Sequence, residues 1–553
     1  MDRRNFFGKT GMGMAACGVG MFSPLGHIGH EKKKDKDTAM EGQQLFIGED
    51  IAVAPTAYGK VKGFVLRGIN VFRGIPYGAD TSGKNRFMPP QPPEPWEDVR
   101  PAVFYGNSAP QDIYDRSPES YSAFVDHWNY DVLSEDCLRL NIWTPKLDSA
   151  KRPVLVWLHG GGFSRGNGIE QDGYDGENIA REGDIVYCSI NHRLGPLGFT
   201  NLAGIDGKFK DSGNVGMLDI VAALRWVNEN ISAFGGDPEN VTIMGQSGGG
   251  AKVCNIASMP MARGLVHKGV ALSGSATHGL DVGYTEKLGQ YILKEAGLEN
   301  NNIEKLQNMP WKEYLNLAYK AANQLELEEG DLGLVRGGFG PIANDISIPK
   351  GEYFSANADQ PDIPLLFCST FHEWNPNRDN PELENISLEG IVEKLRDRYG
   401  DHTQEVVRAF SKNFPEARPI EIWALIVSNR QSGIEAANAK LKQESPVYLA
   451  WFGWESPLFD GRHRAFHCID ISFWLLNTDL MITHTGGGAI PRQLSQKMSK
   501  SLLSFMRTGD PNCDALPLWP RYTAKDVETM ILNNKCSVSN NSDQQARAAL
   551  SNS

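Results

Sequence analysis

The chain has 553 residues and a formal net charge of −12 at pH 7. Hydrophobic residues make up 41% of it and include 12 Trp, which is enough for a large globular core. The acidic balance, with no extended basic stripe to offset it, excludes nucleic acid as an expected partner.

The first 25 residues predict an export signal. Arg3-Arg4-Asn5-Phe6-Phe7 resembles a twin-arginine signal, and the weakly apolar stretch over 10–22 is too short and glycine-rich to span a bilayer. Met14-Ala15-Ala16-Cys17 also resembles a lipoprotein cleavage box. Two alternatives stay open: Cys17 carries a lipid anchor, or it is a chance cysteine of an ordinary exported soluble protein. We expect an exported bacterial protein of the periplasm or cell envelope, with residues 26–50 as a linker.

The following segments alternate between strand and helix patterns. A hairpin is predicted over 58–64, a strand over 71–77 and a Pro-rich surface loop over 87–96. Buried strands are predicted over 153–159, 184–190, 241–244, 269–274, 363–370 and 446–453, with helices over 214–234 and 493–506. This alternation predicts an α/β fold with a large, mostly parallel central sheet and helices on both faces.

Two helical blocks interrupt the predicted sheet. They cover about 284–330 and 388–443, and no internal repeat is present. We expect them to be insertions that form a lid over a single domain, residues 51–553. No segment predicts a transmembrane helix, and the sequence makes no prediction of oligomeric state.

Eight cysteines are scattered along the chain, with neither disulfide-framework nor metal-cluster spacing. Cys188 and Cys368 lie in apolar runs, which predicts buried, inert thiols. Cys513 and Cys536 flank a C-terminal loop, and whether they pair after export stays open.

The most informative stretch is Gly245-Gln246-Ser247-Gly248-Gly249, between an apolar strand and a predicted helix. This is the Gly-x-Ser-x-Gly pattern of a nucleophile elbow, in which small neighbours allow a strained strand-to-helix turn. A Gly-rich loop after a buried strand is the alternative.

A serine nucleophile also needs a base, an orienting acid and oxyanion donors. His159-Gly160-Gly161-Gly162 follows a predicted strand, and with the N–H of Gly248 it predicts an oxyanion hole from Gly161, Gly162 and Gly248.

These motifs occur together with others in an order that resembles the type B carboxylesterases, the α/β-hydrolase family of cholinesterases and para-nitrobenzyl esterases. The similarity covers about Ile51 to Leu532 and is looser over the helical blocks. Its further motifs are Phe72-Arg-Gly-Ile-Pro-Tyr77, Glu135-Asp-Cys-Leu-Arg-Leu-Asn141, Asn191-His-Arg-Leu-Gly195, Asn214-Val-Gly-Met-Leu-Asp219 and Phe234-Gly-Gly-Asp-Pro238.

The resemblance implies the remaining catalytic residues. Glu373 lies where the family places its acid, and His467 lies where the family places its histidine. His372 and His463 are competitors without that context. The implied reaction is hydrolysis of small-molecule carboxylic esters through an acyl-enzyme on Ser247, with His467 as base and Glu373 as the acid that orients it. No metal or organic cofactor is expected.

Several residues depart from the family pattern. Gln246 precedes the nucleophile where Glu is common, and its expected role is hydrogen bonding around the site. Gly248 and Gly250 replace Ala, and Lys252 replaces a small Ser. Lys252 is either a solvated helix residue or a charge felt by the site. Ala109 stands where the family has the first cysteine of an early disulfide, so Cys137 is expected to lack that partner.

The substrate is less constrained. Phe163, Phe371, Trp374, Trp451 and Trp454 are candidates for an aromatic pocket, although buried core aromatics are the commoner explanation. Two alternatives to a general carboxylesterase are a specialised deacylase of a sugar, lipid or natural-product ester, and a neuroligin-like binding protein without catalysis.

Overall fold

The computed structural model describes residues 42–113, 122–125, 129, 132–298, 302–329, 338–356 and 359–551. The chain divides into two compact units, residues 1–44 and 45–553. The predicted export signal, Cys17 and most of the predicted linker lie outside the described residues. None of the helices that the structure describes combines the length and apolar character needed to cross a bilayer.

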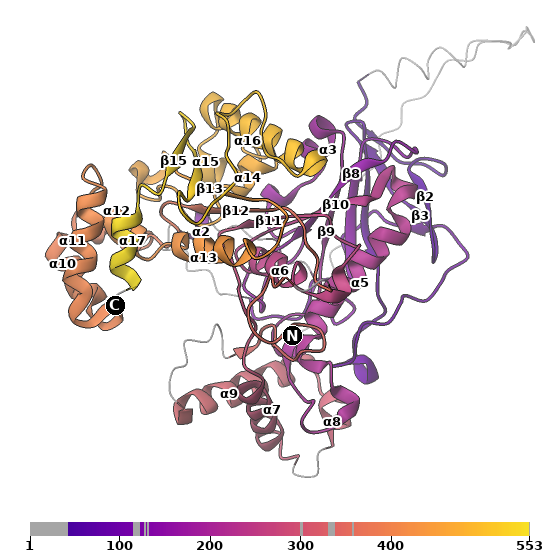
Figure 1. The fold of residues 1–553 in the computed structure, drawn as a ribbon. Helices are drawn as coiled ribbons and strands as arrows, with labels where there is room; N and C mark the ends of the chain where they lie inside the picture. The colour runs from indigo at the N-terminus through magenta and orange to yellow at the C-terminus, as the bar shows by residue number, and fades with distance from the viewer. Residues whose placement is uncertain are drawn as a thin grey trace, which may run out of the picture. The chain divides into compact units, whose positions relative to one another are not determined.

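The unit from residue 45 onward is built on a twelve-stranded sheet (Figure 1), in the order β1-β4-β5-β7-β9-β8-β10-β11-β12-β13-β14-β15. Strands from β9 to β14 are parallel, and β1, β4, β5, β7 and β15 pair antiparallel at the two sides. The predicted large, mostly parallel sheet is therefore confirmed. Its strands are β1 Leu45–Phe46, β4 Phe64–Leu66, β5 Ile69–Pro76, β7 Arg139–Thr144, β8 Arg152–Leu158, β9 Val186–Ile190, β10 Gly236–Gln246, β11 Lys268–Leu272, β12 Leu365–Thr370, β13 Val447–Phe452, β14 Glu528–Leu532 and β15 Ser537–Asn540.

A small second sheet shows where the sequence prediction was wrong. It contains β2 Val53–Thr56, β3 Gly59–Lys62 and β6 Arg100–Pro101. The hairpin predicted over 58–64 lies instead over 53–62, because the turn falls at Ala57 and Tyr58. The Thr56 hydroxyl closes this turn by donating to the Gly59 carbonyl (2.7 Å) and accepting from the Tyr58 N–H (3.2 Å).

Side chains of β8 alternate between two core clusters. Val156 and Leu158 pack in one cluster with residues of α5 and α6, whereas Leu155 and Trp157 pack in the other with α3 and α16. The helices concerned are α3 Glu177–Gly183, α5 Val215–Asn230, α6 Gly248–Ile256 and α16 Ala489–Thr508. Because successive strand residues face opposite sides, a strand buried on both faces must be apolar throughout.

Helices occupy both predicted helical blocks. Within the second block, α13 packs on β12 and β13, so it covers the sheet, while α11 and α12 contribute to a third apolar cluster together with α17. The helices are α7 Val282–Glu295, α8 Ile303–Asn308, α9 Trp311–Glu329, α10 Leu388–Tyr399, α11 Thr403–Asn413, α12 Pro419–Ile426 and α13 Arg430–Lys440. Shorter ones are α2 Ser122–Val125, α4 Gly195–Phe199, α14 Ile471–Trp474, α15 Ile482–Thr485 and α17 Gln544–Ser551.

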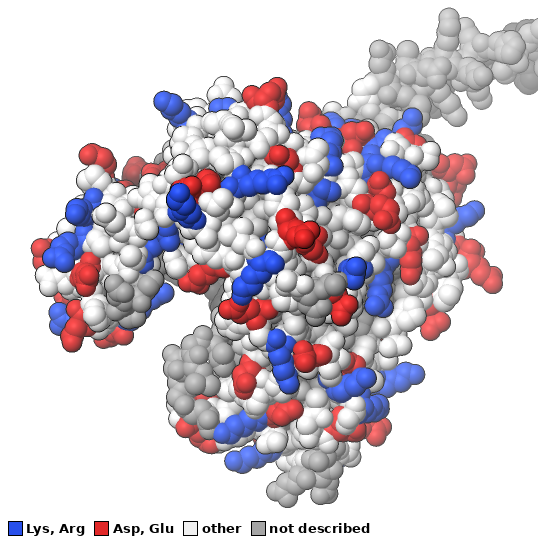
Figure 2. Space-filling view, viewed as in Figure 1, with Lys and Arg blue, Asp and Glu red and all other residues white. Residues whose placement is uncertain are grey.

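Charged side chains are interspersed on the surface. In the view of Figure 2, Lys and Arg alternate with Asp and Glu, and neither sign forms a continuous field.

Several cysteines of the described chain are free thiols. Four of them are buried, namely Cys137, Cys188, Cys254 and Cys368, and Cys513 and Cys536 are free as well. The disulfide that the sequence left open between Cys513 and Cys536 is therefore not formed.

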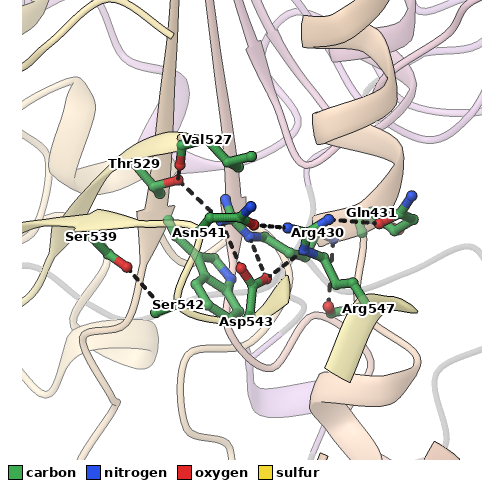
Figure 3. Close-up of polar contacts among 12 residues, drawn as sticks. Arg430, Gln431, Val527, Thr529, Ser539, Asn541, Ser542, Asp543 and Arg547 are labelled. Atoms are coloured by element: carbon green, nitrogen blue, oxygen red, sulfur yellow. Dashed lines mark hydrogen bonds and ion pairs between the residues drawn. The ribbon is translucent and has the colours of Figure 1, made fainter. Parts of the chain in front are cut away.

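A buried ion pair anchors α17 (Figure 3). Arg430, at the start of α13, donates from Nε to Asp543 Oδ2 (3.0 Å) and from Nη2 to the Thr529 hydroxyl of β14 (3.0 Å). Arg547 of α17 donates to the same Asp543 oxygen (3.0 Å). Burial raises the pKa of Asp543, but the two guanidinium groups outweigh it, and the net shift is downward. Asp543 thus holds two elements together as a carboxylate.

Replacing Asp543 with Asn should destabilise the protein, because the buried Arg430 guanidinium loses its counter-charge. Removal of one partner of a buried pair typically costs about 3–5 kcal/mol. We expect a lower urea midpoint for Asp543→Asn and an unchanged midpoint for Asp514→Asn, whose side chain is 88% exposed and lies 3.9 Å from Lys500. Equal midpoints for the two variants would contradict the anchoring role.

Candidate active site

Ser247 lies between the end of β10 and the start of α6, in a strained backbone conformation. Its φ of 58° and ψ of −124° fall outside the regions that L-residues favour. The Ser247 N–H donates to the carbonyl of Leu272 at the end of β11 (2.7 Å). A strained serine at a strand-to-helix turn is the geometry of a nucleophile elbow, and it excludes the alternative of a plain Gly-rich loop.

Glycines around Ser247 allow backbone segments to touch. A Cβ on Gly249 would lie 2.0 Å from the Leu158 carbonyl oxygen, and one on Gly274 would lie 1.8 Å from the carbonyl oxygen of Ser247 itself. A Cβ on Gly245 would meet Gly249 at 2.5 Å. No side chain fits at these positions, so the glycines are required by close approach.

The candidate oxyanion loop lies directly against the elbow. Gly161 and Gly162 have positive φ angles of 80° and 65°, and a Cβ on Gly160 would lie 3.5 Å from Cβ of Ser247. Within the described part of the chain, neither the N–H of Gly162 nor that of Gly248 makes a hydrogen bond. Unpaired N–H groups beside a nucleophile suit the oxyanion of a tetrahedral intermediate, and α6 adds the positive end of its dipole.

Glu373 and His467 are brought together by two different strand ends. Glu373 follows β12 and is buried, and His467 lies in the loop after β13. His467 Nδ1 lies 2.5 Å from Glu373 Oε2, while the other carboxylate oxygen accepts the N–H of Thr370 (2.8 Å). This pairing favours the tautomer with a proton on Nδ1 and leaves Nε2 as an acceptor.

The competing histidines occupy other surroundings. His372 is buried, and its backbone N–H donates to the carbonyl of Ala465 (3.1 Å). Burial lowers the pKa of His372 to about 3, with a smaller contribution from the charge of Arg418. The ring of His463 stacks on Phe459 at a centroid distance of 4.6 Å. Neither imidazole contacts Glu373 in the described structure.

Gln246 contacts His467 directly, which gives its predicted hydrogen bonding around the site a definite partner. Its amide nitrogen lies 3.2 Å from Nε2 of His467, and the Cys468 thiol donates to its Oε1 (3.2 Å). The same amide nitrogen lies 3.5 Å from Nδ1, so it lies against the ring and not in line with the lone pair of Nε2. Among the described residues the Ser247 hydroxyl makes no hydrogen bond to His467. The signal in the sequence was Gln at a position where the family commonly has Glu.

Trp374 is the aromatic residue that faces solvent beside the base. Its ring lies 4.2 Å from the His467 imidazole at an angle of 30°, and it is 48% exposed. A cavity of about 440 Å³ opens next to it. Trp451 and Trp454 are core residues, each 4% exposed, so they are excluded from the predicted aromatic pocket. Phe163 and Phe371 are half-buried, and Trp374 is the exposed candidate. The cavity is lined by Trp374, Arg398, Val427, Ser428, Asn429, Gln431, Ser432 and Glu435.

Comparison with known proteins gives the family. Residues 50–550 match the model of the carboxylesterase family. A para-nitrobenzyl esterase of Bacillus subtilis is 32% identical over 512 residues, which cover 90% of this chain and 98% of that protein. A phenmedipham hydrolase of Pseudarthrobacter oxydans is 32% identical over 499 residues, 87% of this chain and 95% of that one.

Comparison with solved structures supports the same family. An esterase from Clostridium hathewayi, described as able to hydrolyse aliphatic aromatic polyesters, superimposes with a TM-score of 0.77 at 33% identity. The match covers 92% of this chain and 100% of that one. A Geobacillus stearothermophilus carboxylesterase gives 0.71 at 31% identity, with 90% and 99% covered. The chain belongs to the carboxylesterase family, and it is a carboxylic ester hydrolase of the α/β-hydrolase fold.

Replacing Gly248 tests how closely the oxyanion loop must approach the elbow. A Cβ there would lie 2.1 Å from the carbonyl oxygen of Gly162, so Gly248→Ala should push the loop away, although Ala is usual in the family. We expect kcat to fall about 10- to 100-fold, since small displacements of catalytic groups have effects of this size. Gly207→Ala, at an exposed position with nothing within 4 Å of the added Cβ, is the control. Unchanged kcat for Gly248→Ala would show that the loop tolerates the shift.

A carboxylate in place of Gln246 should change the pH dependence of kcat/KM. In Gln246→Glu the new charge lies beside the imidazole and favours its protonated form, so the free base is recovered only at higher pH. The acid limb of kcat/KM should therefore move to higher pH by about one unit. Gln496→Glu adds the same charge at an exposed position on α16 and should leave the limb in place. If the pH profiles of Gln246→Glu and the wild type coincide, the side chain at position 246 does not influence the pKa of the proposed base.

Proposed function

We propose that this carboxylesterase hydrolyses its esters through an acyl-enzyme on Ser247. His467 removes the hydroxyl proton as Ser247 attacks the ester carbonyl, and Glu373 orients the imidazole and stabilises its charge. Gly161, Gly162 and Gly248 donate to the oxyanion. His467 then protonates the leaving alcohol, and water repeats the sequence to release the acid.

The observation that carries this proposal is the 2.5 Å contact between Glu373 and His467 beside a strained serine. The two residues are separated by 94 positions, and the contact leaves Nε2 of His467 as the acceptor on the side of the elbow. Among the described residues the Ser247 hydroxyl does not donate to Nε2 of His467, so the two side chains have to rearrange before proton transfer. Such rearrangement is common, because catalytic hydrogen bonds are often completed only in the substrate complex.

We further propose that the preferred esters carry an aromatic group. The half-exposed Trp374 ring beside the base, with the 440 Å³ cavity next to it, offers a stacking surface near the reacting carbonyl. Two similar proteins, a para-nitrobenzyl esterase and an esterase described as able to hydrolyse aliphatic aromatic polyesters, support the same class. A specialised deacylase would instead be inactive on simple esters of either type.

The decisive experiment labels the nucleophile. A fluorophosphonate probe should label the wild type and fail to label Ser247→Ala, whose kcat on p-nitrophenyl esters should fall by about 10⁴-fold or more. Ser273→Ala, a buried hydroxyl close to the elbow, is the control and should still be labelled. Equal labelling of the wild type and Ser247→Ala would overturn the assignment.

The aromatic preference is tested separately. Higher kcat/KM for benzoate than for acetate esters would support it, and the reverse order would contradict it.

A further inference from the structure

Lys252 is a buried cation in the first turns of α6, immediately after the candidate nucleophile. Its side chain is fully buried, and Nζ donates to the carbonyl oxygen of His159 (2.9 Å). The aromatic ring of Phe163 lies 5.6 Å from Nζ. Within the described residues no carboxylate lies within ion-pair distance of it, so the charge is balanced chiefly by a backbone carbonyl. An isolated buried ammonium is costly, and it replaces the small Ser common in the family.

The carbonyl that Lys252 binds belongs to the residue directly before the Gly-rich loop. The C=O of His159 and the N–H of Gly160 belong to one planar peptide and point in opposite directions. The next carbonyl, of Gly160, is held by Nδ1 of His159 at 3.0 Å, which needs the tautomer with a proton on Nδ1. That bond directs the N–H of Gly161 the other way. Two successive carbonyls are thus held toward the buried side.

The titratable groups that face Lys252 come from three segments. His159 and His192 stack at 5.0 Å, and burial, aided by the charge of Lys252, lowers the pKa of each well below its usual range. Both rings therefore stay neutral. Glu170 is the nearby carboxylate, and Arg193, beyond His192, is paired with Asp219. Burial lowers the pKa of Lys252 to about 7, against a smaller opposing effect of Glu170.

We propose that Lys252 is a positioning residue for the oxyanion loop: its ammonium fixes the His159 carbonyl, and a neutral amine would hold that carbonyl less firmly. The inference rests on the proposed function. The neutral amine keeps only an uncharged hydrogen bond to the carbonyl, and charge-assisted bonds are roughly twice as strong. The rate should therefore decline as the pH rises, while substrate binding, which does not need the oxyanion donors, stays the same.

Stability should follow the opposite trend. Lys252 keeps its proton to about pH 10.4 in an unfolded chain and releases it near 7 in the fold. Between these values the unfolded state binds more protons, so the stability of the wild type rises with pH. Lys252→Met removes the buried charge with little change of volume, so the variant should be more stable than the wild type, most clearly below pH 7. A purely structural lysine would lose stability and activity together.

The experiment measures kcat and KM from pH 6 to 9 for wild type, Lys252→Met and Lys252→Arg, with thermal midpoints. In the wild type kcat should decline with a midpoint near pH 7. Lys252→Met should show about 10-fold lower kcat with KM nearly unchanged and no such decline. Lys252→Arg, which stays charged, should retain kcat and lose the decline. Lys268→Met, at the opposite end of the parallel strands, is the control and should reproduce the wild-type profile.

Three outcomes would overturn the proposal: a wild-type kcat that does not decline over this range, a Lys252→Met enzyme with the wild-type rate and profile, or a Lys252→Arg enzyme that keeps the decline. The first needs no variant, so a folding defect cannot hide it. Fluorophosphonate labelling separates this result from the proposed function. A labelled enzyme with an unaltered profile removes the role of Lys252 alone, whereas an enzyme unlabelled at Ser247 removes the mechanism on which that role rests.

Discussion

Backbone contact around Ser247 is the constraint on which the rest of the site depends. The ends of β8, β10 and β11 and the start of α6 approach so closely that Gly249 and Gly274 have no room for a Cβ. This packing holds Ser247 at a positive φ, a conformation that costs on the order of 1–3 kcal/mol. The serine is therefore positioned by main-chain geometry, which is stiffer than any side-chain contact.

The site has a rigid half and an adjustable half. The elbow and the oxyanion loop are built from backbone groups that are fixed before substrate arrives, which is the arrangement that electrostatic catalysis favours. The proposed base, His467, lies in the other half, where the Gln246 amide and the Trp374 ring both contact its imidazole. The proposed oxyanion donors are main-chain groups, whereas the proposed proton acceptor is surrounded by side chains.

Much of this arrangement could be predicted from the sequence, because its signals are local. The elbow, the Gly-rich loop and the apolar strands each occupy a few consecutive residues, and parallel strands bring their carboxyl ends to one edge. The structure places Gly162 against Gly248, and it brings Glu373 into contact with His467, the pair that the family resemblance implied.

The rest could not be predicted, because it depends on which distant segments meet. The sequence left Lys252 as either solvated or close to the site, and the choice follows from the packing of α6 against the end of β8. The contact between Gln246 and His467 joins residues 221 positions apart. The short helix α17 lacks a long periodic pattern and is held by Asp543.

The anchoring of α17 has a consequence for synthesis of the chain. The third apolar cluster takes Ala546 and Ala549 from α17, and the Arg430 guanidinium finds its carboxylate at Asp543, 113 positions later. A nascent chain that has reached β13 can assemble most of the parallel sheet, yet it must hold α11 and α12 with an uncovered apolar face. Until about residue 550 has emerged, this helical block is the part of the molecule that most needs protection from aggregation.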